Sequence, residues 1–273
     1  MTAGPAAVID RITLVVSDLD RAEDDYVRTF GCRVEHRGDI DPALVRVLCV
    51  RRARGRRSVL RLGRERIELL QFTDSAGCPY PPDSTSTDLW LQHMAIVVSD
   101  MGKAYLRVMA NRRFRPISRH GPVRLPGESG GVTAFKFRDQ DGHPLELLAF
   151  PAGAVPGAWR NGSGSFLGVD HTAIAVSDSA RSAGFFGSVF GFRTGGRTEN
   201  RGPEQAGRGH IRAAASRTSA RRGAAEVTPR TRAIFTECPG PNWVRMSHRR
   251  RTLPRISCMC LDRRRGCRPA RSR

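Results

Sequence analysis

The stretch DRITLVVSD at residues 10–18 recurs as QHMAIVVSD at residues 92–100 and as DHTAIAVSD at residues 170–178. The three copies are almost evenly spaced along the 273-residue chain. Repetition at a nearly constant period indicates one structural unit that recurs, and this unit decides the fold. The second and third copies carry a histidine at their second position, whereas the first copy carries Arg11.

Each copy predicts a strand followed by a helix. Apolar and β-branched residues form a run typical of a strand, and the run ends at a Ser-Asp pair that can cap a helix. We expect helices at residues 19–30 and 179–190, ended by Gly31 and Gly191, and a shorter helix at residues 102–110. Further strands are expected at residues 45–50, 58–62, 66–72, 114–118, 133–138 and 144–150.

This order of elements predicts an α+β fold built from tandem βαβββ modules. We expect the first module at residues 1–75 and the second at residues 85–152, paired with the first. A third module begins at residues 165–205, but its later strands are not recognisable in the sequence.

The positive charge of the chain is concentrated at its C-terminal end. Residues 201–273 contain 19 arginines, no lysine and four acidic residues. Arginine can neutralise nucleic-acid phosphates, but this segment lacks the interleaved aromatic residues of a stacking platform, so we do not expect nucleic-acid binding. We expect residues 206–273 to be disordered, because they offer little apolar surface to bury, or to result from a frameshift in a four-module relative.

The composition limits the location of the protein. The chain has no apolar run long enough to span a membrane, and residues 1–10 lack the pattern of a signal peptide. Its seven cysteines are an odd number with irregular spacing, which argues against a disulfide framework. We therefore expect a cytoplasmic protein that does not contact membranes.

Charged side chains interrupt otherwise apolar strands at three positions. His93 shares a strand face with Ala95, and Glu68 and Glu146 each interrupt an apolar run. A carboxylate in a half-buried strand is costly unless a cation or a metal compensates it. Histidine and carboxylate ligands suit Fe²⁺, Mn²⁺, Zn²⁺ or Ni²⁺, and two histidines with one carboxylate are the pattern of non-haem iron sites. His143 lies in a turn, where we expect it to be solvated.

The repeated opening motif, together with the closing segment DGHPLEL at residues 141–147, resembles the vicinal oxygen chelate superfamily. This superfamily includes glyoxalase I, extradiol dioxygenases, and fosfomycin and bleomycin resistance proteins. The resemblance implies that two modules pair into an open, eight-stranded, cup-like barrel. It also implies a divalent metal in the cup, bound by histidines of first strands and glutamates of last strands.

Transferred by position, the resemblance implies a set of site residues. The second module supplies His93 and Glu146, with Glu146 also the candidate catalytic residue, and the first module supplies Glu68. The third module supplies His171 as a further candidate ligand. Arg11 stands where the first module would have its histidine.

The resemblance favours a metal-dependent enzyme that binds neighbouring oxygens of a small molecule. Two alternatives stay open. Arg11 can contact an anionic group of the substrate, or it can replace the metal by bridging Glu68 and Glu146, which would leave a metal-free binding protein. The chain can also be an inactive, truncated relative of a four-module dioxygenase. The expected partners are a small-molecule substrate and, as a candidate, a second copy of the chain.

Overall fold

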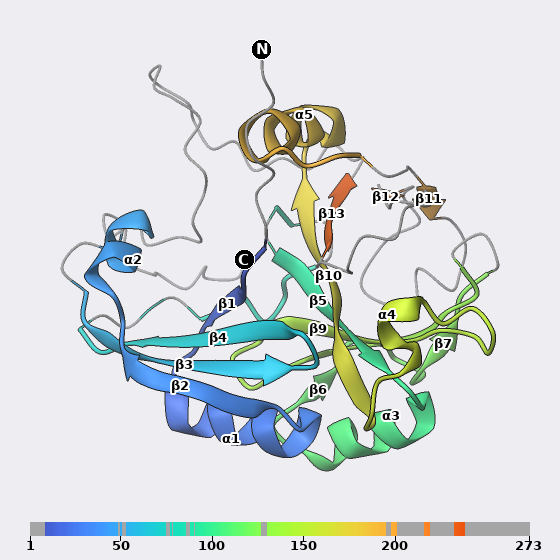
Figure 1. Cartoon of the computed structure of the whole chain (residues 1–273), viewed down its shortest axis with the longest axis horizontal. Coiled ribbons are helices and arrows are strands. Elements are labelled where there is room, and N and C mark those ends of the chain that lie inside the picture. The colour runs from blue at the N-terminus through green and yellow to red at the C-terminus, as the bar shows by residue number, and fades with distance from the viewer. Residues whose placement is uncertain are drawn as a thin grey trace, which may run out of the picture.

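The computed structural model describes residues 9–194, apart from residues 49, 51–52, 75–76, 78, 86–87, 90 and 127–129, and three strands beyond them. The fold is α+β, with two mixed sheets that do not close into a barrel (Figure 1). The part of the chain that the structure describes contains no helix long and apolar enough to cross a membrane. The α+β architecture with mixed sheets confirms the predicted fold class.

The first module forms a four-stranded sheet in the order β1-β4-β3-β2. Its elements are β1 (Ile12–Val15), α1 (Leu19–Phe30), β2 (Arg33–Asp39), α2 (Pro42–Val47), β3 (Gly55–Leu62) and β4 (Glu65–Phe72). The prediction of a strand at residues 45–50 was wrong, because residues 45–47 are the last residues of helix α2. Asp41 caps α2 by accepting a hydrogen bond from the Ala43 amide, and Pro42 occupies its first turn.

The second and third modules contribute to one larger sheet. The second module contains β5 (Leu91–Val98), α3 (Met101–Ala110), β6 (Arg115–Pro116), β7 (Val123–Arg124), β8 (Thr133–Arg138) and β9 (Pro144–Ala149). After α4 (Gly157–Arg160), the third contains β10 (Phe166–Val176), α5 (Ser179–Phe190), β11 (Thr198–Asn200), β12 (Ser216–Thr218) and β13 (Arg232–Glu237).

The strand β10 joins the second module to the third. The larger sheet has the order β11-β12-β13-β10-β5-β9-β8-β6, with β7 also on β8. β10 lies antiparallel to β5 and parallel to β13 (Figure 1). The expectation of disorder for residues 206–273 falls on residues outside the described part of the chain, except for β12 and β13.

The three helices that follow the repeated motif begin in the same way. Asp18, Asp100 and Asp178 each accept a hydrogen bond from the amide three residues on, at 3.1, 3.0 and 2.8 Å. These contacts satisfy amides that have no partner within the helix. Gly31 and Gly191 end α1 and α5 in left-handed conformations, with φ of 74° and 68°. The Ser-Asp pair and the glycines thus set the helix boundaries as the sequence predicts.

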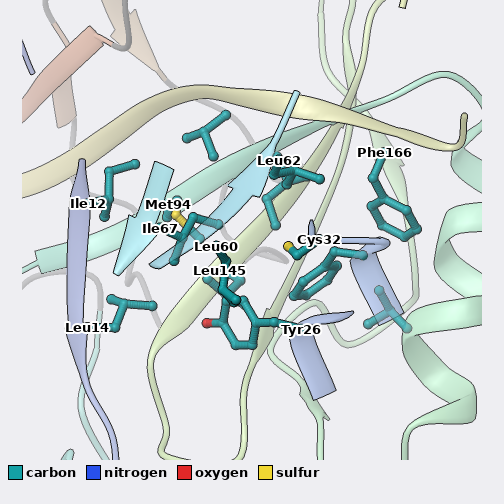
Figure 2. Packing of buried hydrophobic residues seen from close by; sticks show 14 of the residues in the cluster. Ile12, Leu14, Tyr26, Cys32, Leu60, Leu62, Ile67, Met94, Leu145 and Phe166 are labelled. Carbon is teal, nitrogen blue, oxygen red and sulfur yellow. The ribbon is translucent and has the colours of Figure 1, made fainter. Parts of the chain in front are cut away.

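The first two modules share one hydrophobic core. Figure 2 shows side chains of both modules in one cluster, among them Tyr26 of α1 and Leu145 of β9. The Phe30 ring stacks on Phe114 with a centroid distance of 5.8 Å and contacts Phe166 at 5.4 Å. The first module therefore packs on the second through α1, whereas the second and third are joined along β5 and β10.

Candidate metal centre

Three buried side chains meet in the larger sheet. His93 on β5, Glu146 on β9 and His171 on β10 each place one potential ligand atom within 4.8 Å of the other two. His93 Nε2 lies 2.7 Å from Glu146 Oε2 and 3.2 Å from His171 Nε2. The three residues are only 6, 2 and 8 % exposed, respectively. The sequence predicted all three as candidate ligands, and the structure brings them together.

The strand register explains why these side chains converge. Ala95 is the partner of Glu146 in the parallel β5–β9 ladder and of His171 in the antiparallel β5–β10 ladder. Because side chains alternate between the faces of a strand, His93 lies on the same face as Ala95 and therefore beside both partners. Ala95 and Ala173, the register partners of His171 and His93, are themselves buried.

Asp170 orients the third-module histidine. Its Oδ2 atom lies 2.9 Å from His171 Nδ1, and both residues are buried. Nδ1–H therefore donates to the carboxylate, which leaves the lone pair of the ring on Nε2, the atom that faces His93. A carboxylate in this position also fixes the plane of the ring. Asp170 thus holds His171 with Nε2 toward the other two candidate ligands.

Lys136 on β8 is a site residue that the sequence analysis missed. Its Nζ atom lies 2.8 Å from His93 Nδ1 and 3.5 Å from Glu146 Oε2. Lys136 is the register partner of Glu146 in the β8–β9 ladder, so its side chain lies on the ligand face. A lysine within an apolar strand, in a chain with only two lysines, was the signal that could have identified it.

Glu68 occupies the corresponding position in the first module, but its partners are arginines. Thr13 is its register partner in the β1–β4 ladder, as Ala95 is for Glu146. Glu68 Oε1 lies 3.2 Å from Nη1 of both Arg11 and Arg57, and Oε2 accepts a hydrogen bond from Thr13 at 3.0 Å. Among the described residues, Glu68 is not a member of the His93–Glu146–His171 group.

Arg11 thus lies at the position that His93 takes in the second module. Its guanidinium contacts Asp10 at 2.7 Å as well as Glu68. Arg11 thus pairs with Glu68, as expected for the alternative in which an arginine replaces a metal in this module. Arg57, which the sequence did not single out, shares the same carboxylate oxygen.

His143 is buried, so the prediction that it is solvated was wrong. Its Nδ1 atom lies 2.9 Å from Asp139 Oδ2, and the Tyr26 hydroxyl donates to the same oxygen at 3.0 Å. Burial acts to lower the pKa of His143, but the Asp139 carboxylate outweighs it, and the pKa is raised above its usual value. Because Tyr26 belongs to α1, this cluster connects the first two modules rather than contributing to the metal centre.

Comparison with known proteins agrees with this fold. The family model of the glyoxalase/bleomycin resistance protein/dioxygenase superfamily matches residues 8–147, and the chain belongs to this superfamily. A search of curated proteins gives no significant match.

Matches to solved structures of similar fold cover more of the chain than residues 8–147. Glyoxalase I from Zea mays is 18 % identical, with a TM-score of 0.55, and the match covers 86 % of this chain and 68 % of that one. A putative dioxygenase from Bacillus subtilis subsp. subtilis str. 168 is 14 % identical, with a TM-score of 0.50 and coverages of 87 % and 65 %. At these identities the likeness establishes the fold alone.

Proposed function

We propose that the protein is a metal-dependent enzyme of the glyoxalase and dioxygenase type that acts on a small molecule with two neighbouring oxygen atoms. His93, Glu146 and His171 are the metal ligands. The observation that carries this proposal is the convergence of three buried donor atoms within 4.8 Å. Burying these groups together is costly unless a cation compensates them.

The two distances from His93 Nε2 are short enough for a shared divalent metal. Metal bonds to nitrogen and oxygen are about 2.0–2.2 Å long, so two ligands of one ion lie no more than about 4.4 Å apart. The distances from His93 Nε2, 2.7 Å to Glu146 Oε2 and 3.2 Å to His171 Nε2, lie within that limit. Two imidazole nitrogens and one carboxylate oxygen form the ligand set of non-haem Fe²⁺ sites, and Mn²⁺ accepts the same ligands.

The described part of the third module supplies one ligand, His171. Ile234 on β13 is the register partner of Ala173, just as Glu146 is the partner of Ala95 in the second module. The sequence therefore has an isoleucine at the ladder position that corresponds to Glu146. With three protein ligands, a bound metal would have open positions for substrate oxygens.

The residues around such a site would have separate roles. A bound divalent metal would act as a Lewis acid toward the substrate oxygens. Glu146 supplies the negative charge that holds the cation, and Asp170 fixes the orientation of His171. The low exposure of all three ligands excludes bulk water from the site, which strengthens the electrostatic interactions there.

One observation favours a second candidate function, metal-free binding of a small molecule. The second nitrogen of a metal-binding histidine usually donates to an acceptor, but His93 Nδ1 faces the Lys136 ammonium. If Lys136 donates to Nδ1, Nε2–H donates to Glu146 Oε2, and hydrogen bonds connect the cluster without a metal. The same scaffold would then bind its ligand without a metal.

Calorimetric titration of the full-length chain with Mn²⁺, and with Fe²⁺ under anaerobic conditions, tests the proposal. We expect one site, which Glu146→Gln abolishes and His171→Ala weakens. Glu68→Gln is the matched control, because it alters the corresponding carboxylate of the first module. Absence of binding by the folded wild-type chain would overturn the proposal in favour of metal-free binding or an inactive relative.

A further inference from the structure

The turn between β3 and β4 of the first module touches the strand that carries His171. Glu65, the first residue of β4, accepts a hydrogen bond from the Val169 amide on β10 at 3.2 Å. Val169 lies two residues before His171, and both Glu65 and Val169 are buried. This contact links the first module directly to a ligand strand of the metal centre.

Two glycines allow the turn and the strand to approach this closely. A Cβ atom on Gly63, in the turn, would lie 2.1 Å from the Leu167 carbonyl oxygen. A Cβ atom on Gly168 would lie 2.4 Å from Glu65 Oε2 and 2.7 Å from the Trp159 ring. Both glycines have positive φ, at 62° and 147°. A side chain at Gly63 or at Gly168 would therefore prevent the turn and β10 from approaching this closely.

The β10 strand is irregular at the same place. Its register with β5 shifts between Phe166 and Gly168, and again between Val169 and His171. The second shift makes Asp170 an extra residue opposite β5. An extra residue of this kind bends a strand and changes the direction of the side chains beside it. The direction of His171 therefore depends on how the backbone at Val169 is held.

Glu65 is in an unusual environment for a carboxyl group. It is 8 % exposed, and burial raises its pKa, although the hydrogen bond from the Val169 amide acts in the opposite direction. Among the described residues, no salt bridge involves Glu65, in contrast to Glu35, which pairs with three arginines of the same sheet. The contact with β10 accounts for a buried acid at this position.

We propose that Glu65 is a positioning residue for the metal centre: by binding the Val169 amide, it fixes the irregular segment of β10 and places His171 beside His93 and Glu146. The inference rests on the proposed function, because it takes His171 to be a ligand. It extends the site to a residue of the first module, which supplies no ligand of its own.

Metal binding by full-length variants tests this inference. Glu65→Ala removes the acceptor, and we expect Mn²⁺ affinity to fall about tenfold or more, as is usual when a group that supports a ligand is lost. Glu65→Gln keeps an acceptor oxygen at the same position and should restore affinity to within about threefold of wild type. Glu35→Ala is the matched control on the same sheet, and its affinity should equal that of wild type.

A double-mutant cycle separates positioning from general destabilisation. If Glu65 acts through His171, Glu65→Ala should have little further effect on Mn²⁺ affinity in the His171→Ala background. The absorption spectrum of bound Co²⁺ should change in the same direction in both single variants, because both lose or displace the same imidazole.

The outcomes distinguish failure of the inference from failure of the proposed function. If the wild-type chain binds no metal, the proposed function fails and this inference fails with it. If the wild-type chain binds metal but Glu65→Ala binds equally well, only the role of Glu65 is overturned. An equal loss of affinity with and without His171 would also overturn it, since the effect would then not pass through that ligand.

Discussion

Arg11 Nη1 lies 3.2 Å from Glu68 Oε1, whereas His93 Nε2 lies 2.7 Å from Glu146 Oε2 at the corresponding position one module later. The same ladder position thus holds a buried carboxylate in both modules, with a different nitrogen-bearing side chain beside each. In the first module the compensating charge belongs to the protein itself, through Arg11 and Arg57. In the second it must come from Lys136 or from a bound metal.

Loss of Arg11 should destabilise the fold without altering metal binding. Arg11→Met leaves the buried Glu68 carboxylate with Arg57 as its remaining ionic partner, and we expect the free energy of unfolding to fall by about 1–2 kcal/mol. The estimate is modest because the Arg11 side chain is 35 % exposed. Urea unfolding measures the effect.

Arg21→Met is the control for this variant. Arg21 pairs with Asp18 at the surface, so its loss should change the free energy of unfolding by less than about 0.5 kcal/mol. Weaker Mn²⁺ binding by Arg11→Met would contradict the assignment of the metal to the second and third modules.

Removal of the Lys136 charge should strengthen metal binding. The ammonium lies 3.5 Å from the proposed ligand Glu146 and would repel a divalent cation bound there. We expect Lys136→Met to raise Mn²⁺ affinity about tenfold in calorimetry, equivalent to about 1.4 kcal/mol. Lys103→Met, which removes the other lysine from an exposed position, should leave the affinity unchanged. A lower affinity in Lys136→Met would instead show that the lysine supports the ligand set.

Asp170 should contribute to metal affinity through His171. Replacing it by Ala removes the acceptor for His171 Nδ1–H, and we expect Mn²⁺ affinity to fall by about 10- to 100-fold. Asp170→Asn keeps an acceptor oxygen and should lose less. Equal affinities in the wild-type and alanine variants would show that the ring is held without this carboxylate.

His143 should make the stability of the fold depend on pH. Its pKa is raised in the folded state, so the charged form is favoured by folding. The resulting stabilisation is complete below the ordinary histidine pKa of 6.5 and is lost as the pH rises through the higher folded value. Urea unfolding from pH 5 to pH 9 should therefore show a decline in stability that His143→Gln removes. His120→Gln, at an exposed position, should keep the decline.

The repeated motif carried most of the information about the fold. It located β1, β5 and β10, the helices after them and the caps that begin those helices. It did not reveal α2, which depends on a local Asp-Pro start within a segment that otherwise resembles a strand. Nor does a repeat specify which neighbouring strand a module will join, because that choice depends on packing between modules.

The candidate site was accessible to sequence reasoning only in part. His93, Glu146 and His171 could be found because the repeated motif and the family resemblance place candidate ligands at these positions. Lys136, Asp170 and Glu65 could not, because their roles arise from ladder register, from an extra residue in β10 and from a contact between distant segments. Charged residues near these strands are common, and only tertiary structure shows which of them meet.

The position of His171 on β10 also has a consequence for biosynthesis. The ribosome completes both halves of the Arg11–Glu68 pair early, but it adds the last of the three candidate ligands well after His93 and Glu146 have emerged. Because Phe166 and Val169 of β10 belong to the core shared by the first two modules, the nascent chain closes that core and completes the three-residue site in the same step. A polypeptide released before this strand would lack Phe166 and Val169 of the core and one of the three candidate ligands.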